Sequence, residues 1–319
     1  MSMANQKLTL QNPNDLTVEK CFDEYLNHCI IKNLSPETIR LYQNQFRSFK
    51  DILDEETMIS EITVTDVNNY ILHLRKNHTC NDITINSYLR GVRAFLYYAM
   101  EEQHLRPFKV TIPKVEKKIK ETYLDNELKV LLKKPNMKEA TFSEYKIWVF
   151  SNYLLATGNR LSSALSIQIK DLDFDNQQIQ INKTKNRKAQ LIPMSDTLCK
   201  ILKEYLRYRK GEAEDFVFCN TRGGKGDLRT YEDMLAAYNR KRGVAKTSAH
   251  LYRHTFAKKW ILNGGDIFRL QKILGHSDLT VVKEYVQMFG NDLATDFEKF
   301  NPLDRMELRN AKPKLTLSK

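Results

Sequence analysis

The sequence predicts a mainly α-helical protein with one small antiparallel β-sheet. Apolar residues recur at helical spacing along most of the chain, and only 11 of its 319 residues are glycine. One stretch, residues 171–195, instead alternates polar and apolar residues around two turns, which is typical of a three-stranded meander. A chain of this length is expected to form two domains.

Four amphipathic helices are expected in the first domain, over residues 16–107, behind a flexible N-terminus of residues 1–15. The first helix lies between Thr17 and Lys32. The second begins at Ser35-Pro36-Glu37, where a capping serine precedes a proline at the first helical position. The third follows Thr65, and the fourth runs from about residue 83 to residue 102.

Two of these helices carry a polar stripe on a face separate from their apolar face. The stripes consist of Arg40, Asn44 and Arg47 on the second helix, and of Asn86, Arg90 and Arg93 on the fourth. Amide and guanidinium groups in such stripes can lie along a DNA groove and contact bases or phosphates. Solvated helix faces are the alternative interpretation.

Charge and composition limit the class of partner. The formal net charge of +12 and the isoelectric point near 9.3 indicate a polyanionic partner, most often nucleic acid, although an inert basic surface remains the alternative. The five cysteines form no C-x-x-C pair, which argues against a disulfide framework or a thiolate zinc site. No segment reaches membrane-spanning length. We therefore expect a cytoplasmic protein.

The second domain is expected over residues 122–310, ahead of a flexible C-terminus of residues 311–319. A basic, proline-containing linker over residues 108–121 precedes it and is expected to be extended. The domain begins with a helix that Asp125 or Asn126 can cap and that runs through Leu132. A longer apolar helix from about residue 142 ends at Thr157-Gly158 and is followed by the meander. After the meander we expect a helix, a short strand over residues 215–220 and a basic helix.

The segment from Ala249 to Met288 contains the residues with the clearest chemical potential. It is predicted to form three helices, the first two ending at glycines. His250 and Arg253 share a face of the first helix, His276 follows Gly275, and Tyr285 lies on the third helix. A phenol, two imidazoles and a guanidinium brought together in this way can bind a phosphate and attack it.

Short motifs along the chain occur in a characteristic order. They are TGNR at residues 157–160, a hairpin lysine at Lys185, HLYR at 250–253, LGHS at 274–277 and a tyrosine nine residues after that histidine. The chain thereby resembles the tyrosine recombinase family of the phage-integrase type, with the two-domain Xer/Cre-like organisation. This resemblance implies a helical core-binding domain over residues 16–107 and a tyrosine-recombinase catalytic domain over residues 122–310.

The resemblance also implies six catalytic residues. They are Arg160, Lys185, His250, Arg253, His276 and Tyr285. Two positions depart from the family pattern: Asn159 stands where an apolar residue is common, and Ser163 stands where an acid usually follows. His254 is interpreted as a packed or supporting histidine rather than a metal ligand, because no H-E-x-x-H pattern accompanies it.

The implied activity is site-specific recombination of double-stranded DNA through a 3′-phosphotyrosyl intermediate, for the integration or excision of a mobile element. Such an enzyme needs no metal or other cofactor, because arginines hold the phosphate charge. It works as a homotetramer on DNA, and an accessory factor can set its direction. Residues after Tyr285, including Leu293, Phe297 and Phe300, are expected to form a tail that docks on a neighbouring subunit or packs on its own domain.

Two alternatives remain open. A type IB topoisomerase-like enzyme uses nearly the same residues to nick and reseal one strand without a specific partner site. A DNA-binding regulator can keep the fold without the reaction, although it has no need of Tyr285.

Overall fold

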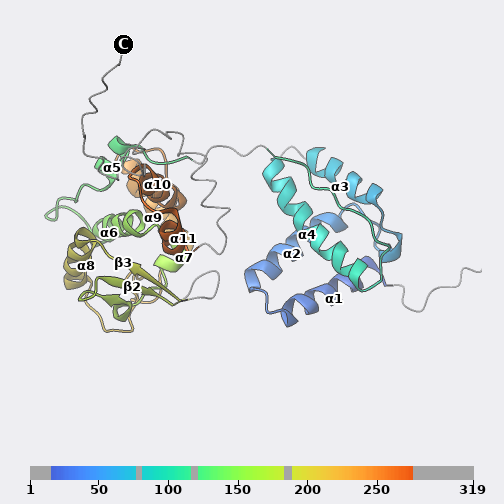
Figure 1. The fold of residues 1–319 in the computed structure, drawn as a ribbon, viewed down its shortest axis with the longest axis horizontal. Helices are drawn as coiled ribbons and strands as arrows, with labels where there is room; N and C mark the ends of the chain where they lie inside the picture. Colours follow the sequence, from blue (N-terminus) through green and yellow to red (C-terminus); the bar gives the residue numbers. More distant parts are fainter. Residues whose placement is uncertain (1–15, 77–80, 116–120, 183–188, 276–319) are drawn as a thin grey trace, which may run out of the picture. The chain divides into compact units, whose positions relative to one another are not determined.

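A computed structural model describes residues 16–76, 81–115, 121–182 and 189–275 (Figure 1). The chain divides into two compact units, with the boundary between residues 118 and 119. Both units are mainly helical, and the second contains a three-stranded antiparallel sheet, as the sequence predicts. None of the helices in the described part of the chain is long and apolar enough to span a membrane.

Unit 1 ends at residue 118, and its described residues form four α-helices. They are α1 (Val18–Ile31), α2 (Pro36–Lys50), α3 (Val64–Lys76) and α4 (Asp82–Glu101), with the 3-10 turn η1 (Ile59–Glu61) ahead of α3. The predicted serine cap of α2 is confirmed, and α1 has a threonine cap that was not predicted from the sequence. Thr17 Oγ1 accepts a hydrogen bond from the N–H of Lys20 at 3.3 Å, and Ser35 Oγ accepts one from the N–H of Thr38 at 3.2 Å.

The core of unit 1 is rich in aromatic side chains. The rings of Phe22 on α1 and Phe46 on α2 stack with centroids 3.7 Å apart, and Phe95 on α4 packs edge-on against both. Gln45 is buried between α2 and α4, where its Nε2 donates to the carbonyl of Ser87 at 2.9 Å. These contacts fix α2 against α4, the two helices that carry the polar stripes.

The segment after residue 107, which the sequence predicts to be an extended linker, packs on unit 1 along its described part. Val110 is 3% exposed within the core of unit 1, and Phe108 and Ile112 pack against that core. The reason is a period-two alternation of apolar residues, which lets an extended chain press one face onto the helices. Asn86 of α4 donates from Nδ2 to the carbonyl of Pro113 at 2.8 Å and holds the same segment.

Unit 2 is built around one buried helix, α6. Its elements are α5 (Asp125–Leu131), α6 (Phe142–Thr157), α7 (Leu161–Ala164), the 3-10 turn η2 (Ile169–Asp171), β1 (Leu172–Asp173), β2 (Gln178–Ile181), β3 (Gln190–Pro193), α8 (Asp196–Arg209), α9 (Leu228–Lys241), α10 (Ala249–Leu262) and α11 (Ile267–Leu274). Ten of the sixteen residues of α6 are buried, and the helix contacts α8, α9 and α10. A helix that is apolar all round belongs in a core, which explains this central position.

The predicted meander is confirmed, with the strand order β1-β2-β3 and antiparallel pairing throughout. The strand expected over residues 215–220 is wrong, because the segment makes only isolated bridges, at Phe216 and Cys219. The N–H of Val217 bonds the carbonyl of Ile167, but the opposite chain then turns into η2. The ladder therefore has no partner along which to extend.

Candidate functional site

Arg253 joins the ends of two helices that are far apart in the sequence. The residue lies on α10 and is 5% exposed. Its Nη1 donates to the carbonyl of Gly158 at 2.7 Å, and its Nη2 donates to the carbonyl of Leu274 at 2.8 Å. Gly158 follows the last residue of α6, and Leu274 is the last residue of α11. Two of the five N–H donors of the guanidinium are therefore used to hold helix ends.

Both helix ends are closed by a left-handed glycine. Gly158 has a φ of 62° and Gly275 a φ of 60°, so the predicted glycine end of α11 is confirmed. The last carbonyls of a helix lack partners within it and carry partial negative charge. The guanidinium of Arg253 is favourable beside these helix ends, because it donates hydrogen bonds to their carbonyls and its positive charge offsets their partial negative charge.

The packing at Gly158 leaves no room for a side chain. A Cβ at this position would lie 2.5 Å from Cδ1 of Phe256 and 2.9 Å from Cδ2 of Leu274. The ends of α6 and α11 and the flank of α10 are therefore in direct contact at one point.

Arg160 lies two residues beyond this contact. It precedes α7 as the N-cap residue, in an extended conformation, and is partly exposed. The segment that carries Arg160 is therefore in direct contact with Arg253, through the carbonyl of Gly158. The two arginines that the sequence assigns to one phosphate come from adjoining segments.

Asn159 has a structural reason to differ from the family pattern. The residue is 5% exposed, and its Nδ2 donates to the hydroxyl of Tyr153 on α6 at 2.5 Å. Burial raises the pKa of Tyr153 far above its usual value, so this phenol stays neutral and needs a partner. Ser163 is also buried, within α7. Sequence reasoning missed the pair because an asparagine six residues after a tyrosine gives no recognisable signal.

His250 lies in the first turn of α10, ahead of Arg253, as expected from the sequence. Its side chain is exposed, and its backbone N–H donates to Oγ of the capping Ser248 at 3.3 Å. The ring of His254 is partly buried, with its centroid 6.4 Å from that of His250. His254 thus packs beside His250, in keeping with a supporting role.

Three of the six predicted catalytic residues, Lys185, His276 and Tyr285, lie outside the described residues, as do the tail residues Leu293, Phe297 and Phe300. The described chain ends directly before His276 and on either side of the segment that contains Lys185. The pair Ile181 and Gln190 closes the β2–β3 ladder on either side of residues 183–188, and Gly275 directly precedes His276.

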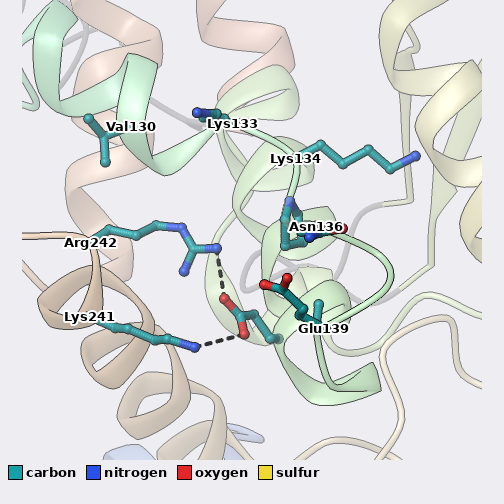
Figure 2. A pocket seen from close by; sticks show the side chains of 10 residues that line it. Val130, Lys133, Lys134, Asn136, Glu139, Lys241 and Arg242 are labelled. Carbon is teal, nitrogen blue, oxygen red and sulfur yellow. Dashed lines mark hydrogen bonds and ion pairs between the residues drawn. The ribbon is translucent and has the colours of Figure 1, made fainter.

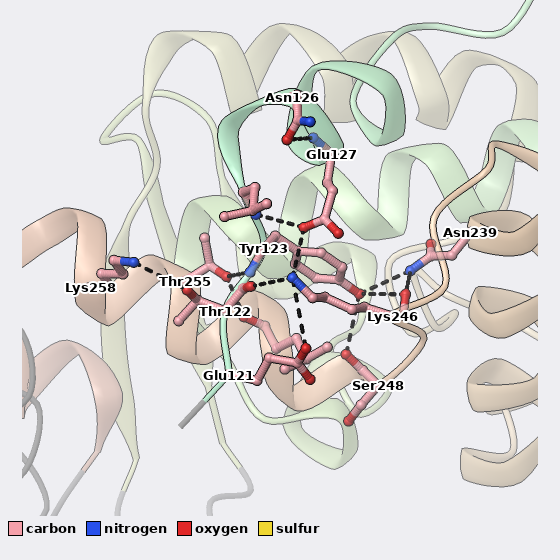
Figure 3. A network of polar contacts seen from close by, with 12 residues as sticks. Glu121, Thr122, Tyr123, Asn126, Glu127, Asn239, Lys246, Ser248, Thr255 and Lys258 are labelled. Atoms are coloured by element: carbon pink, nitrogen blue, oxygen red, sulfur yellow. Dashed lines mark hydrogen bonds and ion pairs between the residues drawn. The ribbon is translucent and has the colours of Figure 1, made fainter. Parts of the chain in front are cut away.

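A polar network fixes α10 to the beginning of unit 2 (Figure 3). The N–H of Tyr123 donates to Oγ1 of Thr255 on α10 at 2.9 Å, and Nδ2 of Asn239 donates to the Tyr123 hydroxyl at 2.9 Å. Lys246, in the segment between α9 and α10, donates to the carbonyl of Thr122 at 3.0 Å and pairs with Glu127 at 3.1 Å. The helix that bears His250 and Arg253 is therefore held rigidly.

A second polar cluster lies near the N-terminal end of α6, where Glu144 is about 21 Å along the helix from Gly158. Glu144 pairs with Lys241 at 3.0 Å and with Arg242 at 2.9 Å on one wall of a cavity of about 500 Å³ (Figure 2). Lys133 and Lys134 also line this cavity. The cluster is therefore distinct from the candidate site around Gly158. The ion pairs of Glu144 join α6 to the end of α9.

The polar stripes of unit 1 differ in how they are placed. Arg40, Asn44, Arg47 and Arg90 are exposed. Arg93 is partly buried, with its guanidinium carbon 6.0 Å from the centroid of the Tyr97 ring. Asn86 is partly buried, and its amide donates a hydrogen bond to the carbonyl of Pro113.

Comparison with known proteins gives matches over nearly the whole chain. The model of the phage integrase family matches residues 123–291, and that of the phage integrase SAM-like domain matches residues 17–119. The chain is similar to tyrosine recombinase XerA of Saccharolobus solfataricus, with 28% identity covering 87% of this chain and 91% of the relative. It is also similar to tyrosine recombinase XerC of Staphylococcus aureus, with 26% identity covering 89% and 97% of the two chains.

Among solved structures, the fold is similar to that of the Tn1549 transposon integrase in complex with a circular intermediate DNA. The TM-score is 0.72 at 20% sequence identity, covering 85% of this chain and 95% of the other. Both units of the structure, their helical composition and the order of the motifs agree with these matches. The chain therefore belongs to the phage integrase family, the family of the tyrosine-type site-specific DNA recombinases.

Proposed function

We propose that this protein cleaves and rejoins DNA strands at a specific site through a 3′-phosphotyrosyl intermediate. The observation that supports this most directly is the position of Arg253. Its guanidinium contacts the segment that leads to Arg160 and the segment that leads to His276. The guanidinium of Arg253, in the HLYR motif, thus bonds the backbone of the TGNR motif and that of the LGHS motif.

The chemistry assigned to these residues follows from the charge of a phosphodiester. Arg160 and Arg253 stabilise the negative charge that grows on the non-bridging oxygens during displacement, and His276 donates a hydrogen bond to the same phosphate. The phenolic oxygen of Tyr285 forms the new bond to phosphorus, and the bond to the 5′ oxygen breaks. His250, exposed beside Arg253, is the partner for the phenolic proton.

Lys185 is assigned the proton that the departing 5′ oxygen requires. An alkoxide is a much poorer leaving group than a phenolate, so its departure depends on a general acid. The phosphotyrosyl bond conserves the energy of the broken phosphodiester. A free 5′ hydroxyl of another strand can therefore reverse the step without ATP.

A nicked DNA substrate tests the proposal. A duplex carrying the recognition site and a nick next to the cleavage point loses the short fragment after attack, which traps the covalent complex. In the presence of a chelator, the wild-type protein should form an adduct that survives denaturation. Tyr285→Phe should bind the same DNA and form no adduct, whereas Tyr208→Phe, a change at an exposed tyrosine of α8, should form it normally. An adduct with Tyr285→Phe would refute the assignment.

The same preparation separates the alternatives. A type IB topoisomerase-like enzyme relaxes supercoiled plasmids that lack the site, and a non-catalytic regulator gives no adduct with any substrate. A recombinase needs a second copy of the site and exchanges strands between the two.

The proposed biological setting is the integration or excision of a mobile element by a tetramer on DNA, with an accessory factor that sets direction. Similarity in fold to a transposon integrase supports this setting by analogy. Two plasmid-borne sites should recombine in cells that express the protein. The covalent complex on paired sites should have the mass of four chains, and the mass of two chains would contradict the tetramer.

A further inference from the structure

Gln190 connects the β2–β3 hairpin to the end of α11. The residue begins β3, and its Nε2 donates to the carbonyls of Lys272 and Ile273, the second at 2.7 Å. Its Oε1 lies beside Gly275, where a Cβ would come within 2.8 Å of that oxygen. The amide of Gln190 therefore rests on the last turn of α11 and on the glycine that ends it.

Every one of the last three carbonyls of α11 is bound by a side chain from another element. Gln190 takes those of Lys272 and Ile273, and Arg253 takes that of Leu274. The carbonyl of Lys272 also accepts from the N–H of Gly275 in the capping turn at 3.0 Å, whereas those of Ile273 and Leu274 are bound by the side chains. The end of α11 is thus fixed from two sides, by β3 and by α10.

Gln190 also occupies the last pair of the hairpin ladder. It stands opposite Ile181, which is 1% exposed, and residues 183–188, with Lys185, lie between the two members of that pair in the sequence. Restraining Gln190 therefore restrains both strands at the point from which the chain leads to Lys185. The other partner, α11, leads directly to His276.

We propose that Gln190 is a positioning residue for strand cleavage, which holds the hairpin in register with α11 so that Lys185 reaches the 5′ oxygen. The inference rests on the function proposed above. Arg253 and Gly275 hold the end of α11 even without Gln190, so the hairpin is the partner that is released when the amide is lost. The defect should accordingly fall on protonation of the leaving group.

Two substitutions separate the hydrogen bonds from the shape of the side chain. Gln190→Met keeps the length of glutamine and removes the donor. Gln190→Lys restores a donor of similar reach, and its charge is favourable beside helix carbonyls. Cleavage of the nicked substrate should slow by roughly 10- to 100-fold in Gln190→Met, as expected for a misplaced catalytic group, and should recover in Gln190→Lys. DNA affinity should stay unchanged in both.

A sulfur-substituted substrate identifies the step. When the 5′ bridging oxygen is replaced by sulfur, attack by Tyr285 breaks a phosphorus–sulfur bond and releases a thiolate. Because the pKa of a thiol is about 8.5, far below that of an alcohol, this leaving group needs no general acid. Gln190→Met should then cleave as fast as the wild-type protein, and so should Lys185→Ala. Arg253→Lys should remain slow on both substrates, because its loss concerns phosphate charge.

The outcomes are distinct. If the wild-type protein forms no adduct, the proposed function fails. If the wild-type protein is active and Gln190→Met cleaves the oxygen substrate at the wild-type rate, only the role of Gln190 fails. The role also fails if Gln190→Met is equally slow on oxygen and sulfur, or if Gln190→Lys is as slow as Gln190→Met.

Discussion

The guanidinium of Arg253 and the carbonyl of Gly158 are joined by a hydrogen bond of 2.7 Å across 95 residues of sequence. A residue expected to bind an external phosphate thus also acts as an internal tie between helix ends. The same cation serves the fold and the proposed chemistry, so its replacement should affect both.

Arg253→Lys is expected to lower the rate of adduct formation by roughly 100- to 1000-fold, the usual effect of losing one donor to a developing oxyanion. It should also lower the free energy of unfolding by about 1–3 kcal/mol, because one ammonium cannot serve both carbonyls and leaves a buried acceptor unpaired. Single-turnover cleavage and urea unfolding measure the two effects. Arg269→Lys, at an exposed arginine of α11, is the control and should change neither.

Gly158→Ala is expected to destabilise the protein by roughly 2–4 kcal/mol, through its left-handed conformation and through contact with Phe256. Gly243 is a matched control, with a φ of 75° and no atom within 4 Å of a Cβ placed there. Gly243→Ala should therefore show the conformational cost alone, about 1–2 kcal/mol. Equal losses in urea unfolding would mean that the tight packing at Gly158 contributes nothing.

Glu144→Gln should be destabilising in a pH-dependent way. The hydrogen bond from Lys241 lowers the pKa of Glu144 below its ordinary value of 4.5, with Arg242 acting in the same direction against the effect of burial. A carboxyl whose pKa is lowered by folding stabilises the protein above its unfolded pKa. That contribution disappears as the pH falls through the folded pKa.

The wild-type protein should consequently be more stable than Glu144→Gln by about 1–3 kcal/mol at neutral pH, since Arg242 loses a partner in a partly buried position. The difference should shrink as the pH falls below 4.5. Urea unfolding over a pH series measures it. Glu139→Gln is the control on the same cavity, because the described residues offer Glu139 no ion pair. A difference that stays constant with pH would contradict the ion-pair explanation.

Arg90→Ala should weaken DNA binding and reduce the slope of log affinity against log salt by about one, if the exposed guanidinium contacts a phosphate. Fluorescence anisotropy at several salt concentrations gives the slope. Lys20→Ala, on α1 and outside both stripes, should leave it unchanged. An unchanged slope for Arg90→Ala would remove this face of α4 from the DNA contact.

Features governed by local chemistry are predictable from the sequence. The cap at Ser35 and the glycine that ends α11 each depend on residues within one turn of one another, and the meander depends on the alternation of apolar residues and on the turns between neighbouring strands. No local pattern in the sequence predicts that Gly158 and Leu274 both contact Arg253. Only the resemblance to a known family led us to expect that these motif segments lie close together.

The features that sequence reasoning missed depend on long-range partners. Gln190 looks like an ordinary polar residue on a strand, and its function depends on carbonyls more than 80 residues away. The packing of Phe108 and Val110 required knowledge of the surface that receives them. The prediction of a short strand over residues 215–220 was wrong because the opposite segment turns into η2.

The bond from Tyr123 to Thr255 has a practical consequence for dissecting the molecule. A recombinant fragment intended to retain the catalytic half must start upstream of Thr122, even though the first helix of that half begins only at Asp125. Trimming to the helix boundary would remove the hydroxyl that accepts from Asn239 and the carbonyl that accepts from Lys246. The ends of such a fragment should therefore be chosen to keep the hydrogen bonds of Thr122 and Tyr123, and not only the complete helices.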